Sequence, residues 1–530
     1  MLGRRLSFRL ACASAALVAV TGVAVSGTAR AETVLKVALH SDLKIIDPIW
    51  TTALISTHHG NMIYDTLFAV NDKLEVKPQM VDTWTVSPDK LTYSFVLRDG
   101  LEWHDGTPVT AEDCVASIRR WAAKDGMGQK LMSVVSELSA PDAKTIKMVL
   151  KEPYGLVLET LGKSSSNVAF MMPKRIADGD PNTQITDATG SGPFIFKKDE
   201  WKPGEKAVYV KNPKYKPRAE PASGLSGGKI AKVDRVEWIT IPDQQTQVNA
   251  LLNGEIDLIE FVPADLMPLL QKDRNIKTFV TNLAGRQFAM RFNVLHKPFD
   301  NAKVRQAVLY ALDQKPFLDA NVGDPLYYRE CRSLFPCGSP LESTRGWDDK
   351  VRGNVGKARE LLKEAGYDGS PVVLMHQTDT ANHNQLATVA KPQLEAAGFK
   401  VDLQSSDWQS VVARRVKKDP PDKGGWNLML TSWVSADILN PVMAGFFNSS
   451  CDKAMFGWPC DEKIEKMRDE FSKETDPAKQ KQIAIDLQKY WVDNPTHINV
   501  GQWYAPMALR KNIDGILIAP VPVFWNVSKK

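Results

Sequence analysis

The chain has little net charge and no cluster of one sign. Its 530 residues carry +5 in total, and four of the arginines lie before residue 32, where there is no acidic residue, so the rest of the chain carries +1. In that part, lysine and arginine are interspersed with aspartate and glutamate. Nucleic-acid-binding surfaces need clustered cations. We therefore set nucleic acid aside as a partner.

Long apolar runs are missing after residue 25. The one run, 11–25, spans about 15 residues, short of the roughly 20 that a membrane-spanning helix needs. Three arginines precede it, and the sequence Ala29-Arg30-Ala31, with small residues on either side of the arginine, follows it. This order is typical of a secretory signal peptide. We expect residues 1–31 to be removed before Glu32, with export by either the Sec or the twin-arginine route, and a soluble mature protein.

No catalytic motif is complete. The GKS sequence at 162–164 resembles the end of a phosphate-binding loop, but Val157 stands where its first glycine is required. The GSG at 190–192 lacks the flanking glycines of a nucleophile elbow, and the HDG at 104–106 is typical of a turn after a strand. The eight histidines include no pair three or four apart with a carboxylate partner. We expect no catalytic residue, no cofactor and no bound metal.

Cysteine is scarce as well. Five of the six cysteines follow the signal segment. Cys331 and Cys337 enclose five residues, and Cys451 and Cys460 enclose eight, in loop-like sequence. In an oxidising compartment these pairs predict two disulfides, each stabilising by about 2–3 kcal/mol on a chain-entropy model. Cys114 is left over, and we expect it to be buried and inert.

The chain does contain enough apolar sequence for more than one core. With 43% hydrophobic residues and about 500 mature residues, two or three domains are expected. TVLKVAL at 33–39 and LTYSFVL at 91–97 alternate as half-buried strands do. The stretch 216–229 is rich in Pro, Gly and Ser and predicts an exposed loop.

From about residue 300 the pattern changes to alternating helices and strands. Apolar residues at helical spacing begin at Val304, with Asp300 or Asn301 available as the N-cap. Two further helical patterns, at 355–362 and 386–397, each reach a glycine before a strand. Consecutive helix–glycine–strand units predict an α/β lobe.

Residues 95–121, FVLRDGLEWHDGTPVTAEDCVASIRRW, bring a strand, a turn, an AED sequence and a helix together in order. This stretch resembles the signature of the family 5 extracellular solute-binding proteins of ABC importers, the dipeptide and oligopeptide type. Cys114 departs from the pattern, since an apolar residue is usual there. The resemblance covers nearly the whole mature chain, with further matches in IYDTLF at 63–68, GSGPFIFKKDEW at 190–201, KPFDNAKVRQAVLYALD at 297–313 and KARELLKEAGY at 357–367.

The resemblance implies an α/β, two-lobed periplasmic-binding-protein fold with an extra sheet domain and a large ligand cleft between the lobes. By this analogy the chain would cross between the lobes near 295 and 500, and closure of the lobes would trap the ligand. The implied first lobe comprises residues 32–72, 185–295 and 500–530 with the extra domain 73–184, and the second lobe comprises 296–499.

The resemblance also implies a ligand contact in TSWVSADILNP, residues 431–441. In the peptide-binding members a similar stretch carries an aspartate that pairs with the ligand's α-amino group, and Asp437 stands at the matching position. Capping of the following turn is the alternative role for Asp437. Trp433 and Asn440 are further candidates for binding the substrate.

Other candidates come from residue type. Trp408 and Trp426 could face the cleft, although core packing is at least as good an explanation for either. Trp433 is the first choice among the tryptophans, and Trp408 is kept as a further substrate-binding candidate. Arg286 or Arg291, near the predicted hinge, could meet a ligand carboxylate, but surface exposure or an internal ion pair is the role that we expect for them.

Together these features predict a periplasmic substrate-binding protein that binds a peptide or peptide-like solute and delivers it to a permease. Relatives carry nickel chelates, opines, sugars and glutathione, so a receptor for one of these is the alternative. A secreted hydrolase is the alternative from another class, and it would need a nucleophile and a base. We expect no enzymatic activity and a monomer whose partners are its ligand and the transmembrane subunits of an ABC permease.

Overall fold

The computed structural model describes residues 32–263, 265–380 and 383–530. The predicted signal peptide, residues 1–31, lies outside the described residues. Within the described ranges, no helix is both long enough and apolar enough to cross a membrane.

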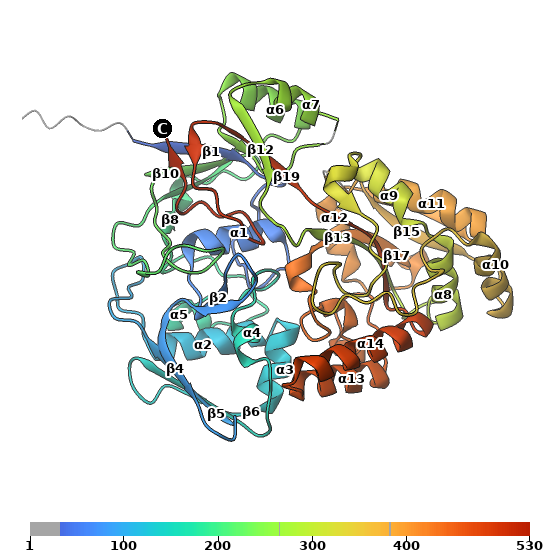
Figure 1. Cartoon of the computed structure of the whole chain (residues 1–530), viewed down its shortest axis with the longest axis horizontal. Helices are drawn as coiled ribbons and strands as arrows, with labels where there is room; N and C mark the ends of the chain where they lie inside the picture. Colours follow the sequence, from blue (N-terminus) through green and yellow to red (C-terminus); the bar gives the residue numbers. More distant parts are fainter. Residues whose placement is uncertain (1–31, 264, 381–382) are drawn as a thin grey trace, which may run out of the picture. The chain divides into compact units, whose positions relative to one another are not determined.

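The first sheet has seven strands and contains the chain's first strand at its centre (Figure 1). Leu35 and Val37 of that strand, β1, are fully buried, as the alternating pattern predicts. β1 runs parallel to both of its neighbours, and the other pairings are antiparallel. In spatial order the strands are β12 (Ile276–Val280), β19 (Pro506–Arg510), β11 (Leu258–Ile259), β1 (Val34–Ala38), β10 (Arg235–Ile239), β9 (Lys206–Lys211) and β8 (Phe194–Phe196).

The second sheet has six strands and lies in the region where helices and strands alternate. Its parallel strands β15 and β16 are joined through helix α11 (Leu386–Ala397), which ends at the left-handed Gly398. The predicted α/β character of this region is thus confirmed. In spatial order the strands are β14 (Tyr328–Arg329), β18 (His497–Trp503), β13 (Arg286–Phe292), β17 (Leu428–Val434), β15 (Pro371–Gln377) and β16 (Lys400–Ser406).

A separate antiparallel sheet of four strands lies within residues 81–150. Helix α2 (Ala111–Ala122) contacts this sheet and starts with a capping box between Thr110 and Asp113. Cys114 of this helix is fully buried, and burial raises the pKa of its thiol, as expected for an inert cysteine. The strands in spatial order are β4 (Val81–Val86), β5 (Thr92–Leu97), β7 (Thr145–Leu150) and β6 (Val135–Ser139).

The remaining elements surround these sheets. Asn301 caps α8 by accepting the N–H of Lys303, so the second of the two predicted caps is used. The shorter strands are β2 (Phe68–Val70), β3 (Val76–Pro78), β20 (Ile513–Asp514) and β21 (Ser528–Lys529). The other helices are α1 (Leu54–Ile63), α3 (Gly126–Val134), α4 (Val157–Leu161), α5 (Lys174–Ala177), α6 (Gln244–Asn253), α7 (Met267–Lys272), α8 (Ala302–Ala311), α9 (Gln314–Asn321), α10 (Val355–Glu364), α12 (Trp408–Arg415), α13 (Glu462–Lys473) and α14 (Pro477–Asp493).

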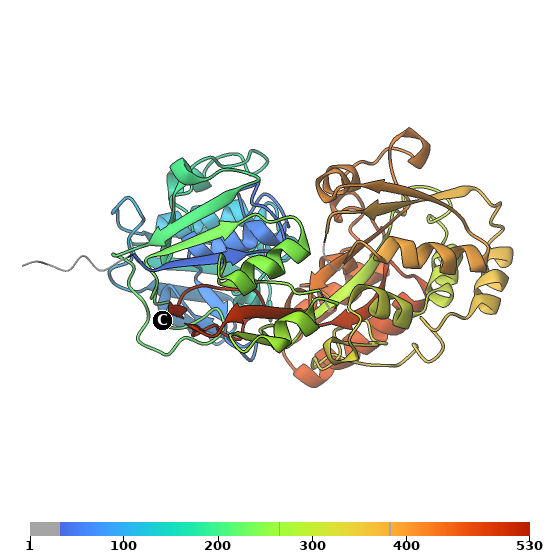
Figure 2. The ribbon, with the colours of Figure 1, turned by 90° about the horizontal axis from the view of Figure 1, so that it is seen from above.

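Two short connections join the two large sheets. The first runs from β12 to β13 and the second from β18 to β19 (Figure 2). β12 and β19 are hydrogen-bonded neighbours in the first sheet, and β13 and β18 are hydrogen-bonded neighbours in the second. The first connection, residues 281–285, lies before the predicted crossing near 295, because Arg286–Phe292 continues as a strand of the second sheet. The domain boundaries predicted from the family stay a prediction.

The loop at 216–229 is only partly exposed, which corrects the expectation of an exposed loop. Residues 224–229 are buried, and Lys229 forms an ion pair with the buried Asp65 at 2.8 Å. Gly224 has a φ of 58°, and a Cβ there would lie 2.6 Å from the carbonyl carbon of Asn71. The glycines therefore allow close packing of this segment against the neighbouring backbone.

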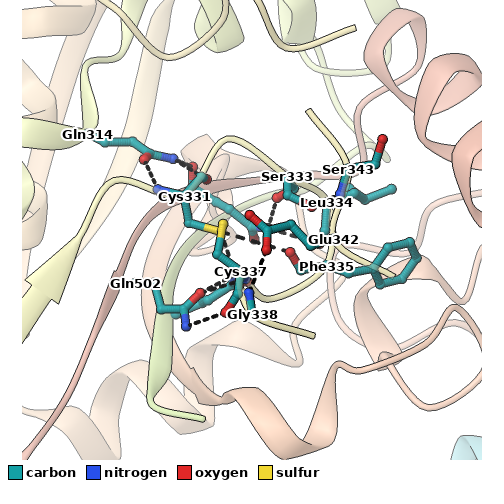
Figure 3. The surroundings of a disulfide bond; sticks show 12 residues. Gln314, Cys331, Ser333, Leu334, Phe335, Cys337, Gly338, Glu342, Ser343 and Gln502 are labelled. Carbon is teal, nitrogen blue, oxygen red and sulfur yellow. Dashed lines mark hydrogen bonds between the residues drawn. A yellow bond between two sulfur atoms is a disulfide. The ribbon is translucent and has the colours of Figure 1, made fainter. Parts of the chain in front are cut away.

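Both predicted cysteine pairs form disulfides, Cys331–Cys337 and Cys451–Cys460. The Cys331–Cys337 loop is also held by two glutamines (Figure 3). The N–H of Cys331 donates to Gln314 Oε1 at 2.7 Å, and the N–H of Cys337 donates to Gln502 Oε1 at 2.8 Å. Gln502 belongs to β18, so the disulfide loop is fixed to the second sheet.

Candidate ligand-binding cleft

Two adjoining cavities have walls built from segments that are far apart in the sequence. Their volumes are ≈ 120 Å³ and ≈ 640 Å³. Some wall residues precede the first connection between the large sheets and others lie between the two connections. The cavities share seven lining residues: Thr52, Ser166, Gln409, Val412, Arg415, Trp433 and Asp437.

Asp437 is a buried carboxyl group in this wall. It ends the 3-10 helix η4 (Ser435–Asp437), directly after β17, and its residue is 2% exposed. Its Oδ1 atom is buried and has no hydrogen-bond partner among the described residues. Burial raises the pKa of Asp437 to about 6, although Lys163 and Ser165 act in the opposite direction. The group thus has an unused acceptor beside a cavity.

Asn440, not Asp437, holds the turn that follows. Its Oδ1 accepts the N–H groups of Val442 at 3.0 Å and Met443 at 2.8 Å. Asn440 is not among the residues that line the cavities. The side chain of Asn440 is thus engaged with the backbone of its own turn, and substrate binding by Asn440 stays a prediction.

Two of the three candidate tryptophans line a cavity. Trp433 borders both cavities, and its ring packs edge-on against Phe446 with centroids 4.6 Å apart. Trp408 begins α12 and borders the smaller cavity. Trp426 is fully buried and donates its Nε1–H to the carbonyl of Arg415 at 3.1 Å, so it belongs to the core.

A buried ion pair beside Asp437 was missed in the sequence. Lys163 pairs with Asp125, and both line the larger cavity. Asp125 also caps α3 by accepting the N–H groups of Met127 and Gly128. Lys163, the lysine of the GKS sequence, therefore pairs with the carboxylate of Asp125, 38 residues earlier, instead of with a phosphate. No local pattern reveals a pairing at that separation.

Two buried arginines belong to the same wall. Arg286 begins β13 and borders the smaller cavity, and Arg415 ends α12 and borders both cavities. Arg291, the other hinge candidate, donates instead to the carbonyls of Phe446 and Phe456. Arg286 is one of the two arginines noted near the predicted hinge, although a ligand contact is not the role expected for it from the sequence. Nothing in the sequence distinguishes Arg415 from the adjacent Arg414.

His40, His58 and Glu260 form a group of possible metal ligands next to the smaller cavity. His40 Nδ1 lies 2.8 Å from Glu260 Oε2, and His58 Nε2 lies 3.9 Å from Glu260 Oε1. Burial lowers the pKa of His58 to about 3, so this ring is neutral. The positive charge of Arg286 acts on both His58 and Glu260 and opposes a dication there. The group fits a hydrogen-bonded His40–Glu260 pair better than a metal centre.

The comparisons with known proteins agree on one family. The model of the bacterial extracellular solute-binding proteins, family 5 Middle, matches residues 75–454. The probable peptide ABC transporter periplasmic-binding protein y4tO of Sinorhizobium fredii is 39% identical over 533 residues, which cover 100% of this chain and 99% of that protein.

Solved structures show the same fold at low sequence identity. The periplasmic binding protein AgaA of A. tumefaciens, in complex with agropinic acid, has a TM-score of 0.80 at 21% identity, over 94% of this chain and 99% of that one. DppA from Helicobacter pylori, in complex with the peptide STSA, has a TM-score of 0.77 at 22% identity, over 94% and 98%. The expected two-lobed fold of periplasmic binding proteins is thus confirmed.

Proposed function

Because the chain belongs to the bacterial extracellular solute-binding proteins of family 5, we propose that it is the periplasmic receptor of an ABC importer for a peptide or a peptide-like solute. In this proposal the signal peptide directs export, and the mature protein acts as a monomer. It closes on its ligand and passes it unchanged to the transmembrane subunits of the permease. Proteins of this family bind small-molecule or peptide ligands and work with ABC permeases.

The observation that carries the proposal is the unused carboxylate oxygen of Asp437 at the cavity wall. An ammonium group is the natural partner for such an oxygen, because a charge-assisted hydrogen bond offsets the cost of burying the carboxylate. A free amino terminus or the amino group of an amino-acid conjugate would supply it. Trp433 and Trp408 would pack against the apolar parts of the ligand.

Binding without chemical conversion is part of the proposal. Ser165 and Ser166 line the smaller cavity, as Asp437 does. In the described part of the chain, no histidine forms a hydrogen bond with either hydroxyl, so neither belongs to a serine–histidine pair of the kind that activates a serine. Recovery of each tested ligand unchanged after prolonged incubation is the expected result.

A thermal-shift screen tests the receptor proposal. The refolded, ligand-stripped mature protein is screened against di- to pentapeptides, opines, glutathione and sugars, as wild type, Asp437→Asn and Asp422→Asn. Asp422 is an exposed carboxylate outside the cavity walls and serves as the control. We expect a peptide to raise the melting temperature of wild type and Asp422→Asn but not of Asp437→Asn. If only sugars or metal chelates stabilise the protein, the peptide assignment is wrong.

A further inference from the structure

Arg286 is a buried cation without a hydrogen-bond acceptor. Its residue is 6% exposed, and its guanidinium lies over Phe261 at 4.6 Å and Trp503 at 5.7 Å from the ring centroids. Its side chain donates no hydrogen bond to any described residue and forms no ion pair within 4.0 Å there. A guanidinium has five N–H donors, and leaving them unmatched in a buried site is costly. The aromatic rings hold the group in place and leave its N–H edges to the cavity.

Arg415 is similar. Its residue is 9% exposed, and its guanidinium lies 4.4 Å from the ring centroid of Phe456 and 5.7 Å from that of Trp408. One hydrogen bond is present, from Nη2 to Thr52 Oγ1 at 3.2 Å, and the buried Nε has no partner among the described residues. Burial lowers the pKa of Arg415 to about 10, which indicates that no nearby carboxylate offsets the cost.

The protein provides acceptors for its other buried arginines. Arg120 pairs with Asp47 at 2.9 Å, Arg291 donates to two backbone carbonyls, and Arg468 pairs with Glu465 and donates to the carbonyl of Pro441 at 2.8 Å. Each of these three side chains has a carboxylate or carbonyl acceptor, although the Nε atoms of Arg120 and Arg291 have no partner among the described residues. Within that part of the chain, Arg286 and Arg415 lack an acceptor of that kind, and both line the smaller cavity together with Asp437.

Glu260 does not supply the missing acceptor. Its Oε2 accepts from the ring of His40 at 2.8 Å and from the N–H of His40 at 3.0 Å. Glu260 and Asp437 both favour the charged form of Arg286, but burial has the larger effect and lowers the pKa of this arginine. The donors of Arg286 therefore remain available for a group that enters the cavity.

We propose that the solute carries one ammonium group and two carboxylates, with the ammonium on Asp437 and one carboxylate on each of Arg286 and Arg415. This inference rests on the proposed receptor function and narrows its ligand class to acidic peptides and amino dicarboxylates. Guanidinium groups pair with carboxylates in a bidentate geometry that fixes orientation. A neutral peptide with a single carboxylate would leave the donors of one buried arginine unmatched.

Matched dipeptides test this inference. Isothermal titration compares Ala-Glu with Ala-Gln and Glu-Ala with Gln-Ala, because each pair differs by one carboxylate at nearly constant shape. We expect the acidic member of at least one pair to bind at least tenfold more tightly than its amide counterpart. Arg286→Gln or Arg415→Gln should reduce that ratio to below threefold, and the matching lysine variants should keep part of it.

Arg414→Gln is the matched control. Arg414 adjoins Arg415 on the same helix, donates to the carbonyls of Gly424 and Gly425 and does not line the cavities, so this variant should keep the full ratio. The ratio of the two affinities within a dipeptide pair does not depend on the fraction of the variant that is folded. Equal affinities within both pairs, or a preference that survives both glutamine variants, overturn the inference and leave the receptor function standing. If neither these dipeptides nor any of the di- to pentapeptides of the thermal-shift screen bind, the receptor proposal for peptides fails and the inference fails with it.

Discussion

Asp437 is buried at the cavity wall, and burial disfavours its ionised form. Its pKa in the folded protein is about 6, above the ordinary value of 3.8. Between these two values the folded state binds more protons than the unfolded state, so the stability of the empty protein falls as the pH rises from about 4 to about 6. At neutral pH the empty protein therefore holds an unfavourable charge that a cationic ligand can neutralise.

Replacing Asp437 should therefore stabilise the empty protein. We expect Asp437→Asn to raise the free energy of unfolding at pH 7.5 by about 1–3 kcal/mol, because the buried charge is removed and the shape is kept. Below about pH 3 the gain should disappear, since the carboxyl group is then mostly neutral in both states. Urea unfolding at both pH values measures the difference. A loss of stability at pH 7.5 would show that the carboxylate is satisfied in the empty protein.

Lys163 acts on two carboxylates. It forms an ion pair with Asp125, and it lowers the pKa of Asp437. Lys163→Met leaves Asp125 buried without its cation, and we expect a loss of about 3–5 kcal/mol in the free energy of unfolding. The same change should raise the pKa of Asp437, because Lys163 lowers it in the wild type. Chemical denaturation measures the first effect, and the pH dependence of unfolding measures the second.

The double variant Asp125→Asn with Lys163→Met is the control for this prediction. Asparagine can still cap α3, so the double variant should recover most of the lost stability. Equal stabilities of the single and double variants would argue that the ion pair is not what makes Lys163 important.

Between elements, the Cys331–Cys337 disulfide closes a short loop that two glutamines already anchor. We expect the double substitution of both cysteines by serine to lower the free energy of unfolding by about 2 kcal/mol, the value for so short a loop on the chain-entropy model. Urea unfolding of the variant and of wild type with and without reductant measures the loss. An unchanged midpoint would mean that the glutamine contacts suffice to order the loop.

The elements themselves were largely predictable because their signals are local. Alternation marked β1 and β5, and helical spacing with a terminal glycine marked α10 and α11. The prediction of an exposed loop at 216–229 was only half correct. The burial of its second half depends on the pairing of Lys229 with Asp65, 164 residues away. The cavity wall was the least predictable part. Its Lys163–Asp125 pair and its unmatched arginines depend on contacts between distant segments.

In the whole molecule, the two connections between the large sheets limit how the lobes can move. Residues 281–285 and 504–505 are short, and Gly285 has a φ of 71°, with a would-be Cβ only 2.6 Å from the carbonyl oxygen of Trp503. Two adjacent connections favour a hinge over free separation. We expect the radius of gyration, measured by small-angle scattering, to decrease when a ligand binds. An unchanged radius would indicate a receptor that does not close.

The most direct test of the account is the affinity of a peptide before and after its amino group is blocked. Isothermal titration at pH 7.5 compares the best dipeptide with its N-acetyl derivative, using wild type and Asp437→Asn. We predict that acetylation weakens binding to wild type at least 100-fold, and that it changes binding to Asp437→Asn much less. Equal affinity of the free and acetylated peptides for wild type would contradict ammonium capture at Asp437.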